Sequence, residues 1–133
     1  MTQVFFRKDL THLRATAIAE INARAGVARG RYITVAPGQE MIYLRKETEA
    51  RRYLELETPP ETLVDFPFMA AEIGVTASTP YELAQLWLNM SAMFEVVGSQ
   101  LEQVRLQSIY AVEEADHPAV IDGILHAFKT QLQ

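Results

Sequence analysis

The residue types that most often carry catalysis or bind metals are few in this chain and lie far apart. Its three histidines are His12, His117 and His126, and it contains no cysteine. No two histidines have the i, i+4 spacing of a helical zinc site, and no HExxH pattern is present. Without a thiol and without a Ser/His/Asp signature, nucleophilic catalysis has no starting point. The sequence therefore predicts no catalytic residue and no metal ligand, and we expect a protein that is not an enzyme.

Two further patterns could indicate ligands, but structural roles explain them better. Glu113, Glu114 and Asp116 form an acidic cluster that could suggest a divalent cation. A solvated end of a helix explains the same cluster more simply. The glycines of residues 26–38 match neither of the spacings found in phosphate-binding loops. We therefore expect no cofactor.

Composition and charge restrict the classes of partner. The chain has 133 residues, of which 49% are hydrophobic and 22% charged, as expected for one globular domain. The net charge of −5 arises in residues 79–133, where Arg105 and Lys129 stand against seven acids. Such a half cannot neutralise a row of phosphates, so nucleic-acid binding through it is disfavoured. No stretch approaches the roughly 20 apolar residues of a membrane span, and we expect a cytosolic protein.

Hydrophobic periodicity predicts a mainly α fold, namely a small helical bundle in one domain over residues 1–133. The first helix is expected over residues 9–25, with Asp9 as its N-cap and Gly26 as its stop. The other predicted helices cover residues 39–56, 67–74, 80–115 and 117–130. The bundle is thus built on one long helix in the C-terminal half.

The connection over residues 31–44 is ambiguous. Residues 32–35 are β-prone and are followed by the turn dipeptide Pro37-Gly38. Met41 to Tyr43 could form the second arm of a hairpin, whereas the helix formers that follow favour a helix from about Gln39. A short extended segment and a hairpin both remain open.

Two helix starts are marked by capping patterns. In Thr79-Pro80-Tyr81-Glu82, the threonine can cap, the proline suits the first helical position and the glutamate completes a capping box. Asp116-His117-Pro118 has the form of a cap for the last helix, which gives His117 a structural role.

The long helix carries a heptad seam, with residues spaced alternately four and three apart. Its members are Leu83, Trp87, Met90, Phe94, Val97, Leu101, Val104, Ser108 and Ala111. The bulky Trp87 and Phe94 suit a regular two-stranded coiled coil poorly. The seam therefore predicts an intramolecular bundle core in which Trp87 is buried.

A second set of apolar residues lies off this seam and is the predicted protein-binding surface. Its members are Leu88, Val96, Leu106, Ile109 and Tyr110. The same surfaces carry uncharged polar groups such as Gln103 and Gln107, which interfaces tolerate better than charges. Sizeable exposed apolar patches usually mark interaction sites. The alternative is that the first and last helices of the chain cover this set.

Three parts of the sequence resemble small tail-region proteins of tailed bacteriophages. They are Ala28 to Tyr43 with the following Lys46 and Glu49-Ala50, Phe66 to Gly74, and Glu102 with Arg105. This resemblance implies a tail-fibre assembly chaperone or an accessory tail protein, acting in the host cytoplasm during assembly. The alternative is a permanent structural component of the virion tail or baseplate. The implied partner is a phage tail or tail-fibre protein, with a homo-oligomer as a further expectation, and no catalytic or binding residue can be carried over.

Overall fold

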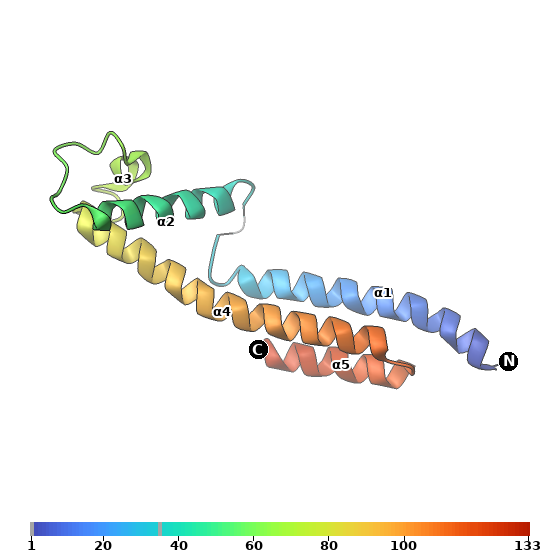
Figure 1. The fold of residues 1–133 in the computed structure, drawn as a ribbon. Coiled ribbons are helices and arrows are strands. Elements are labelled where there is room, and N and C mark those ends of the chain that lie inside the picture. The colour runs from blue at the N-terminus through green and yellow to red at the C-terminus, as the bar shows by residue number, and fades with distance from the viewer. Residues whose placement is uncertain (1, 35) are drawn as a thin grey trace. The chain divides into compact units, whose positions relative to one another are not determined.

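The computed structural model describes the backbone of residues 2–34 and 36–133 and the side chains of residues 10–34 and 36–133. Five helices follow one another along the chain (Figure 1). They are α1 (Thr2–Arg29), α2 (Gln39–Glu55), α3 (Pro67–Glu72), α4 (Pro80–Glu114) and α5 (Pro118–Gln131). None of the described residues belongs to a strand of a sheet. The predicted mainly α fold with one long helix is confirmed.

The chain divides into two compact units, each with its own apolar core. Unit 1 comprises the residues up to Ile33 together with Val97–Gln133, and unit 2 comprises Thr34–Val96. The boundary falls within α4, which runs without interruption from Pro80 to Glu114 and so is not broken at Gly98. Where the sequence suggested one bundle core, the described residues form two clusters.

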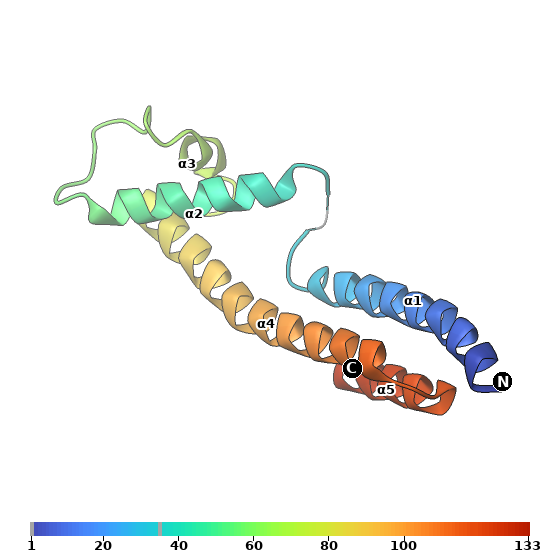
Figure 2. The same cartoon turned by 45° about the vertical axis from the view of Figure 1, so that its right-hand side comes forward.

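Unit 1 consists of α1, the C-terminal half of α4, and α5, which lie side by side (Figures 1 and 2). One face of α1 lines the core, and the remaining buried residues come from α4, from Ala115 just beyond its end, and from α5. The cluster consists of Leu10, Ala17, Ile21, Ala25, Val112, Ala115, Ile121 and Phe128. The burial of one stripe of α1 explains the 3.6-residue periodicity seen in the sequence.

Two arginines of unit 1 satisfy backbone carbonyls at helix C-termini. The Arg14 side chain on α1 donates to the carbonyl of Ala115, just beyond the end of α4, with Nε at 3.2 Å. The Arg31 guanidinium donates to the carbonyl of Leu132, just beyond α5, at 2.7 Å. These carbonyls have no partner within their own helices, and the negative end of the helix dipole favours a cation there. The two arginines therefore join segments that are distant in sequence.

Unit 2 packs α2 and α3 onto the N-terminal part of α4. Its buried cluster consists of Ala50, Phe66, Met69, Leu83, Ala84 and Trp87. Trp87 is only 6% exposed, so its predicted burial is confirmed. The Lys46 ammonium lies 5.0 Å from the centre of the Trp87 ring, on the α2 side of the cluster. Trp87 is the single tryptophan of the chain, and it therefore reports on unit 2 alone.

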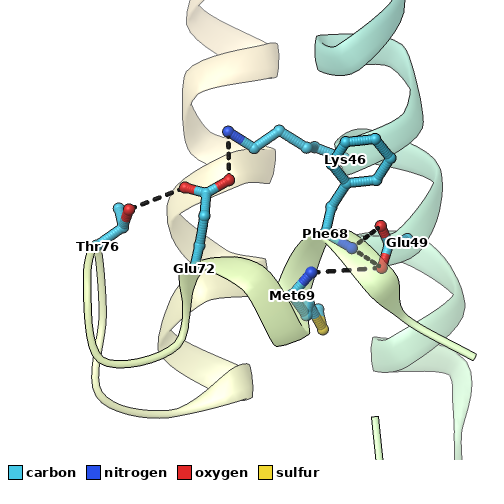
Figure 3. A network of polar contacts seen from close by, with 6 residues as sticks. All are labelled: Lys46, Glu49, Phe68, Met69, Glu72 and Thr76. Carbon is cyan, nitrogen blue, oxygen red and sulfur yellow. Dashed lines mark hydrogen bonds and ion pairs between the residues drawn. The ribbon is translucent and has the colours of Figure 1, made fainter. Parts of the chain in front are cut away.

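A buried carboxylate holds α3 in place (Figure 3). Glu49 of α2 is 4% exposed and accepts hydrogen bonds from the backbone N–H of Phe68 at 2.9 Å and of Met69 at 3.4 Å. These groups belong to the first turn of α3, where amides have no partner in the helix and the dipole favours an anion. At the other end of α3, Glu72 pairs with Lys46 at 2.6 Å and accepts from Thr76. Both ends of this short helix are thus tied by side chains, one from α2 at each end.

Several predicted boundaries need correction. Helix α1 begins at Thr2 and ends at Arg29, so Asp9 is not its N-cap and Gly26 is not its stop. The buried Ala25 and Ala28 flank this glycine, and their packing outweighs the roughly 1 kcal/mol that a helical glycine costs. Helix α3 ends at Glu72, two residues before the expected Gly74.

The hairpin considered for residues 31–44 is wrong, because Met41 to Tyr43 lie within α2. Gly38 precedes α2 as its N-cap with φ of 84°, a left-handed conformation that glycine adopts without strain. Val35, part of the β-prone segment, lies outside the described residues.

Both capping patterns are confirmed as helix starts. The Thr79 hydroxyl accepts from the N–H of Glu82 at 3.2 Å at the start of α4. His117 is the N-cap of α5, and its Nδ1 accepts from the N–H of Ala119 at 3.3 Å. His117 thus has the structural role that the sequence predicted.

Candidate protein-binding surface

The structure separates the predicted binding residues into exposed and packed ones. Val96, Leu106 and Tyr110 are 57%, 37% and 63% exposed. Leu88 instead packs against the core of unit 2, and Ile109 packs against the core of unit 1. The chain's own helices therefore cover part of this set and leave the rest on the surface.

Two of the exposed residues form a patch on α4 in unit 1. Leu106 and Tyr110 lie one turn apart on α4. The exposed Gln103 and Gln107 lie on the same face, because residues 103, 106, 107 and 110 have the spacing i, i+3, i+4 and i+7. We call these four side chains the unit 1 patch. It carries no charge, its apolar groups can be buried by a partner, and its amides can donate and accept hydrogen bonds. Interfaces are enriched in tyrosine and depleted of lysine and glutamate.

The α4 backbone beneath this patch is held by contacts on other faces of the helix. The Arg105 guanidinium donates to Asn22 of α1 at 2.8 Å, and its Nε donates to Glu102 at 3.0 Å. The hydrogen bonds from Arg105 lower the pKa of Glu102 below its ordinary value and raise that of Arg105. Because Ile109 and Val112 pack against the core of unit 1, the patch rests on a fixed helix. A preformed surface loses less conformational entropy on binding than a mobile one.

The acidic cluster lies just beyond the patch. Glu113, Glu114 and Asp116 are all exposed. Glu113 and Glu114 follow Tyr110 by three and four residues, so they lie on the adjoining turn of α4. Among the described residues, no group of three or more His, Cys, Asp or Glu is placed to hold a metal ion. The arrangement of these acids gives the rim of the patch a negative charge.

Sequence reasoning missed a second exposed apolar stripe on α4, in unit 2. Leu86, Met90 and Met93 are 37%, 46% and 55% exposed and follow one another at i, i+4 and i+7. We call them the unit 2 stripe. The assignment of Met90 to a buried seam is wrong, because the apolar partners of α4 in unit 2 gather around Leu83, Ala84, Trp87 and Leu88. Figures 1 and 2 show α2 meeting α4 near the start of α4 and diverging from it further along.

None of the described helices is long and apolar enough to cross a membrane. Comparisons of the chain with protein-family models, with curated proteins and with solved structures give no match.

Proposed function

We propose that this protein works by binding another protein through the unit 1 patch, as a tail-fibre assembly chaperone or accessory protein of a tailed phage. The observation that carries the proposal is the exposed, uncharged surface of Leu106 and Tyr110 with their flanking glutamines on a fixed helix. The sequence resemblance supports the kind of partner. A protein of this type acts in the host cytoplasm during assembly and needs no catalytic residue.

The chemistry of the patch defines what the partner must offer. Its centre should be an apolar segment that covers Leu106 and the ring of Tyr110, with polar groups within reach of Gln103 and Gln107. Tyrosine is among the residues that contribute most at interfaces, because it combines a large apolar area with a hydroxyl. The acidic rim at Glu113 and Glu114 favours basic residues around the partner's apolar centre.

Co-expression with each tail component encoded beside this chain tests the proposal. We expect one defined tail or tail-fibre protein to co-purify with the wild type. Leu106→Glu and Tyr110→Glu should each weaken that association at least tenfold, about 1.4 kcal/mol, while the helical circular dichroism stays unchanged. Val120→Glu is the matched control, because Val120 is a 46% exposed apolar residue on α5 of the same unit.

Two results would contradict the proposal. One is that every tail component fails to bind the wild type. The other is that the variants at positions 106 and 110 bind as well as Val120→Glu. Quantifying the chain in purified virions then distinguishes the roles: a chaperone is absent or substoichiometric, whereas a permanent part of the tail or baseplate appears in fixed copy number.

A further inference from the structure

The unit 1 patch becomes acidic at one end. With a rotation of about 100° per residue, Glu113 and Glu114 lie on the same face of α4 as Leu106 and Tyr110. Both glutamates are exposed. The buried Val112 lies about 200° around the helix from Tyr110, so this face points away from the core of unit 1. The surface is therefore one stripe, which is uncharged over its first turns and doubly negative at the C-terminal end of α4.

The described part of the chain does not neutralise this acidic end. None of the ion pairs between described residues includes Glu113 or Glu114. Residues 106–128 contain four acids and no lysine or arginine. Arg14 reaches this end of α4, but its guanidinium donates to the carbonyl of Ala115. The two carboxylates can therefore meet a cation from another molecule.

The position of these acids is unfavourable for the helix itself. A carboxylate in the last turn of a helix faces the negative end of the helix dipole, where lysine or arginine is stabilising. The helices α1, α2 and α5 follow this rule, with Arg29, Arg52 and Lys129 in their last turns. The last turn of α4 has no basic residue and carries Glu113 and Glu114 instead. A partner that supplies cations there would offset this cost, so the acids suit binding better than folding.

We infer that the segment bound by the unit 1 patch is basic and amphipathic, with lysine or arginine residues on one side of an apolar centre; this rests on the proposed function. The apolar centre covers Leu106 and Tyr110. The cations lie against Glu113 and Glu114, about 4.5–6 Å further along α4 than Tyr110. This spacing is one turn of a helical partner or about two residues of an extended one. A segment without cations leaves the two carboxylates partly desolvated and unpaired, and so binds more weakly.

Two model peptides test this charge preference on the full chain by fluorescence anisotropy. Both are helical with leucines along one face, and one end carries lysines in the first peptide and glutamates in the second. The lysine peptide should bind the wild type at least tenfold more tightly, with an affinity that falls as salt is added. Glu113→Gln and Glu114→Gln should each reduce this preference. Asp122→Asn is the matched control, because it removes an exposed acid from α5 of the same unit, and it should leave the preference unchanged.

The thermal stability of the same variants separates a binding role from a structural one. Followed by helical circular dichroism, Glu113→Gln and Glu114→Gln should each raise the midpoint of unfolding, because each removes a charge that opposes the helix dipole. Acids that held the fold together would give a lower midpoint when replaced. A weaker preference for the lysine peptide together with a higher midpoint therefore identifies the two glutamates as binding groups.

Three results would overturn the inference. The first is equal affinity for the two peptides, and the second is a lysine preference that survives both glutamine substitutions. The third is self-association of the wild type that Tyr110→Glu abolishes, because a second copy would then cover the patch. A tail protein whose binding needs Leu106 and Tyr110 but neither acid would support the proposed function and refute this inference. A lysine preference that depends on both acids, without any tail protein that binds, would refute the proposed function alone.

Discussion

Replacing Glu49 by alanine should destabilise unit 2 more than any change of an exposed acid on the same helix. The carboxylate is buried and accepts from two backbone donors in the first turn of α3, Phe68 N–H and Met69 N–H (Figure 3). Alanine removes the acceptor and leaves both donors in a site that water reaches poorly. Such a loss costs more than the hydrogen bonds contribute net, because the donors keep their full desolvation penalty.

The expected magnitude follows from these two donors. A buried donor without a partner costs about 1–3 kcal/mol, which gives about 2–6 kcal/mol for two. The Phe68 amide is only part-buried, so we expect Glu49→Ala to lower the free energy of unfolding of unit 2 by about 2–4 kcal/mol. Glu49→Gln keeps one acceptor oxygen but loses the charge that strengthens the bonds, and should cost about 1–2 kcal/mol.

Denaturant unfolding followed by the fluorescence of Trp87 measures this effect, because the single tryptophan lies in the same buried cluster as Met69. Hydrogen exchange over residues 67–72 should show faster exchange in α3 for Glu49→Ala. Glu55→Ala is the control: Glu55 is exposed at the C-terminal end of α2, where an acid opposes the helix dipole. If Glu49→Ala and Glu55→Ala gave the same tryptophan transition, the carboxylate would not be what holds α3.

Three further changes test other parts of the structure. Trp87→Ala should destabilise unit 2 by about 3–5 kcal/mol if the site cannot collapse, and the wild-type tryptophan should fluoresce at the wavelength of a buried indole. Thr79→Ala should cost about 1 kcal/mol by leaving the amide of Glu82 uncapped, and an unchanged denaturation midpoint would contradict this. Hydrogen bonds from Lys129 and Arg24 hold the pKa of Glu20 below its ordinary value of 4.5. Since the folded pKa of Glu20 is the lower one, its two ion pairs stabilise the folded state above about pH 4.5, and this stabilisation is lost as the pH falls through the folded pKa. Glu20→Gln should therefore reduce the acid sensitivity of the helical circular dichroism.

The sequence predicts well those features, such as helix caps, that depend only on residues close to one another in the chain. The caps at Thr79 and His117 are confirmed because each uses its own side chain and an amide two or three residues further on. The end of α1 shows the limit of such reasoning. Gly26 is a reasonable local stop, but the burial of Ala25 and Ala28 in tertiary contacts carries the helix on to Arg29.

The cap of α3 could not be found from local patterns. Its N-cap, Phe66, makes no side-chain capping bond, and the carboxylate that serves α3 comes from Glu49, about 19 residues earlier. In the sequence, Glu49 is one of several acids in a charged helix, and no local pattern shows that its carboxylate would be buried. Only the packing of α2 against α3 brings it to these amides.

The heptad seam on α4 is confirmed for some of its residues and wrong for others. Leu83, Trp87 and Ser108 are buried as predicted, whereas Met90 and Ala111 are exposed. A straight helix drifts by about 20° per heptad relative to a strict seven-residue repeat. Over the four heptads from Leu83, this drift turns Ala111 outward and favours its neighbour Val112, which is fully buried. At Met90 the cause is different, because the apolar partners of α4 in unit 2 gather at Leu83 to Leu88.

The exposed apolar residues of α4 thus belong to two different units, so binding through one unit can be tested while the other stays folded. A periodic pattern indicates which residues could pack together, but the position of the covering helices decides which of them do. Leu106 and Tyr110 lie on the part of α4 that belongs to unit 1, and Met90 and Met93 lie on the part that belongs to unit 2. Because the two cores share no residue, an acidic substitution on one surface should leave the packing beneath the other unchanged. For the Leu106→Glu and Tyr110→Glu variants, Trp87 fluorescence then reports whether unit 2 stays folded, and the helical circular dichroism, to which α1 and α5 contribute, reports whether unit 1 does. Together the two signals distinguish loss of binding from loss of fold.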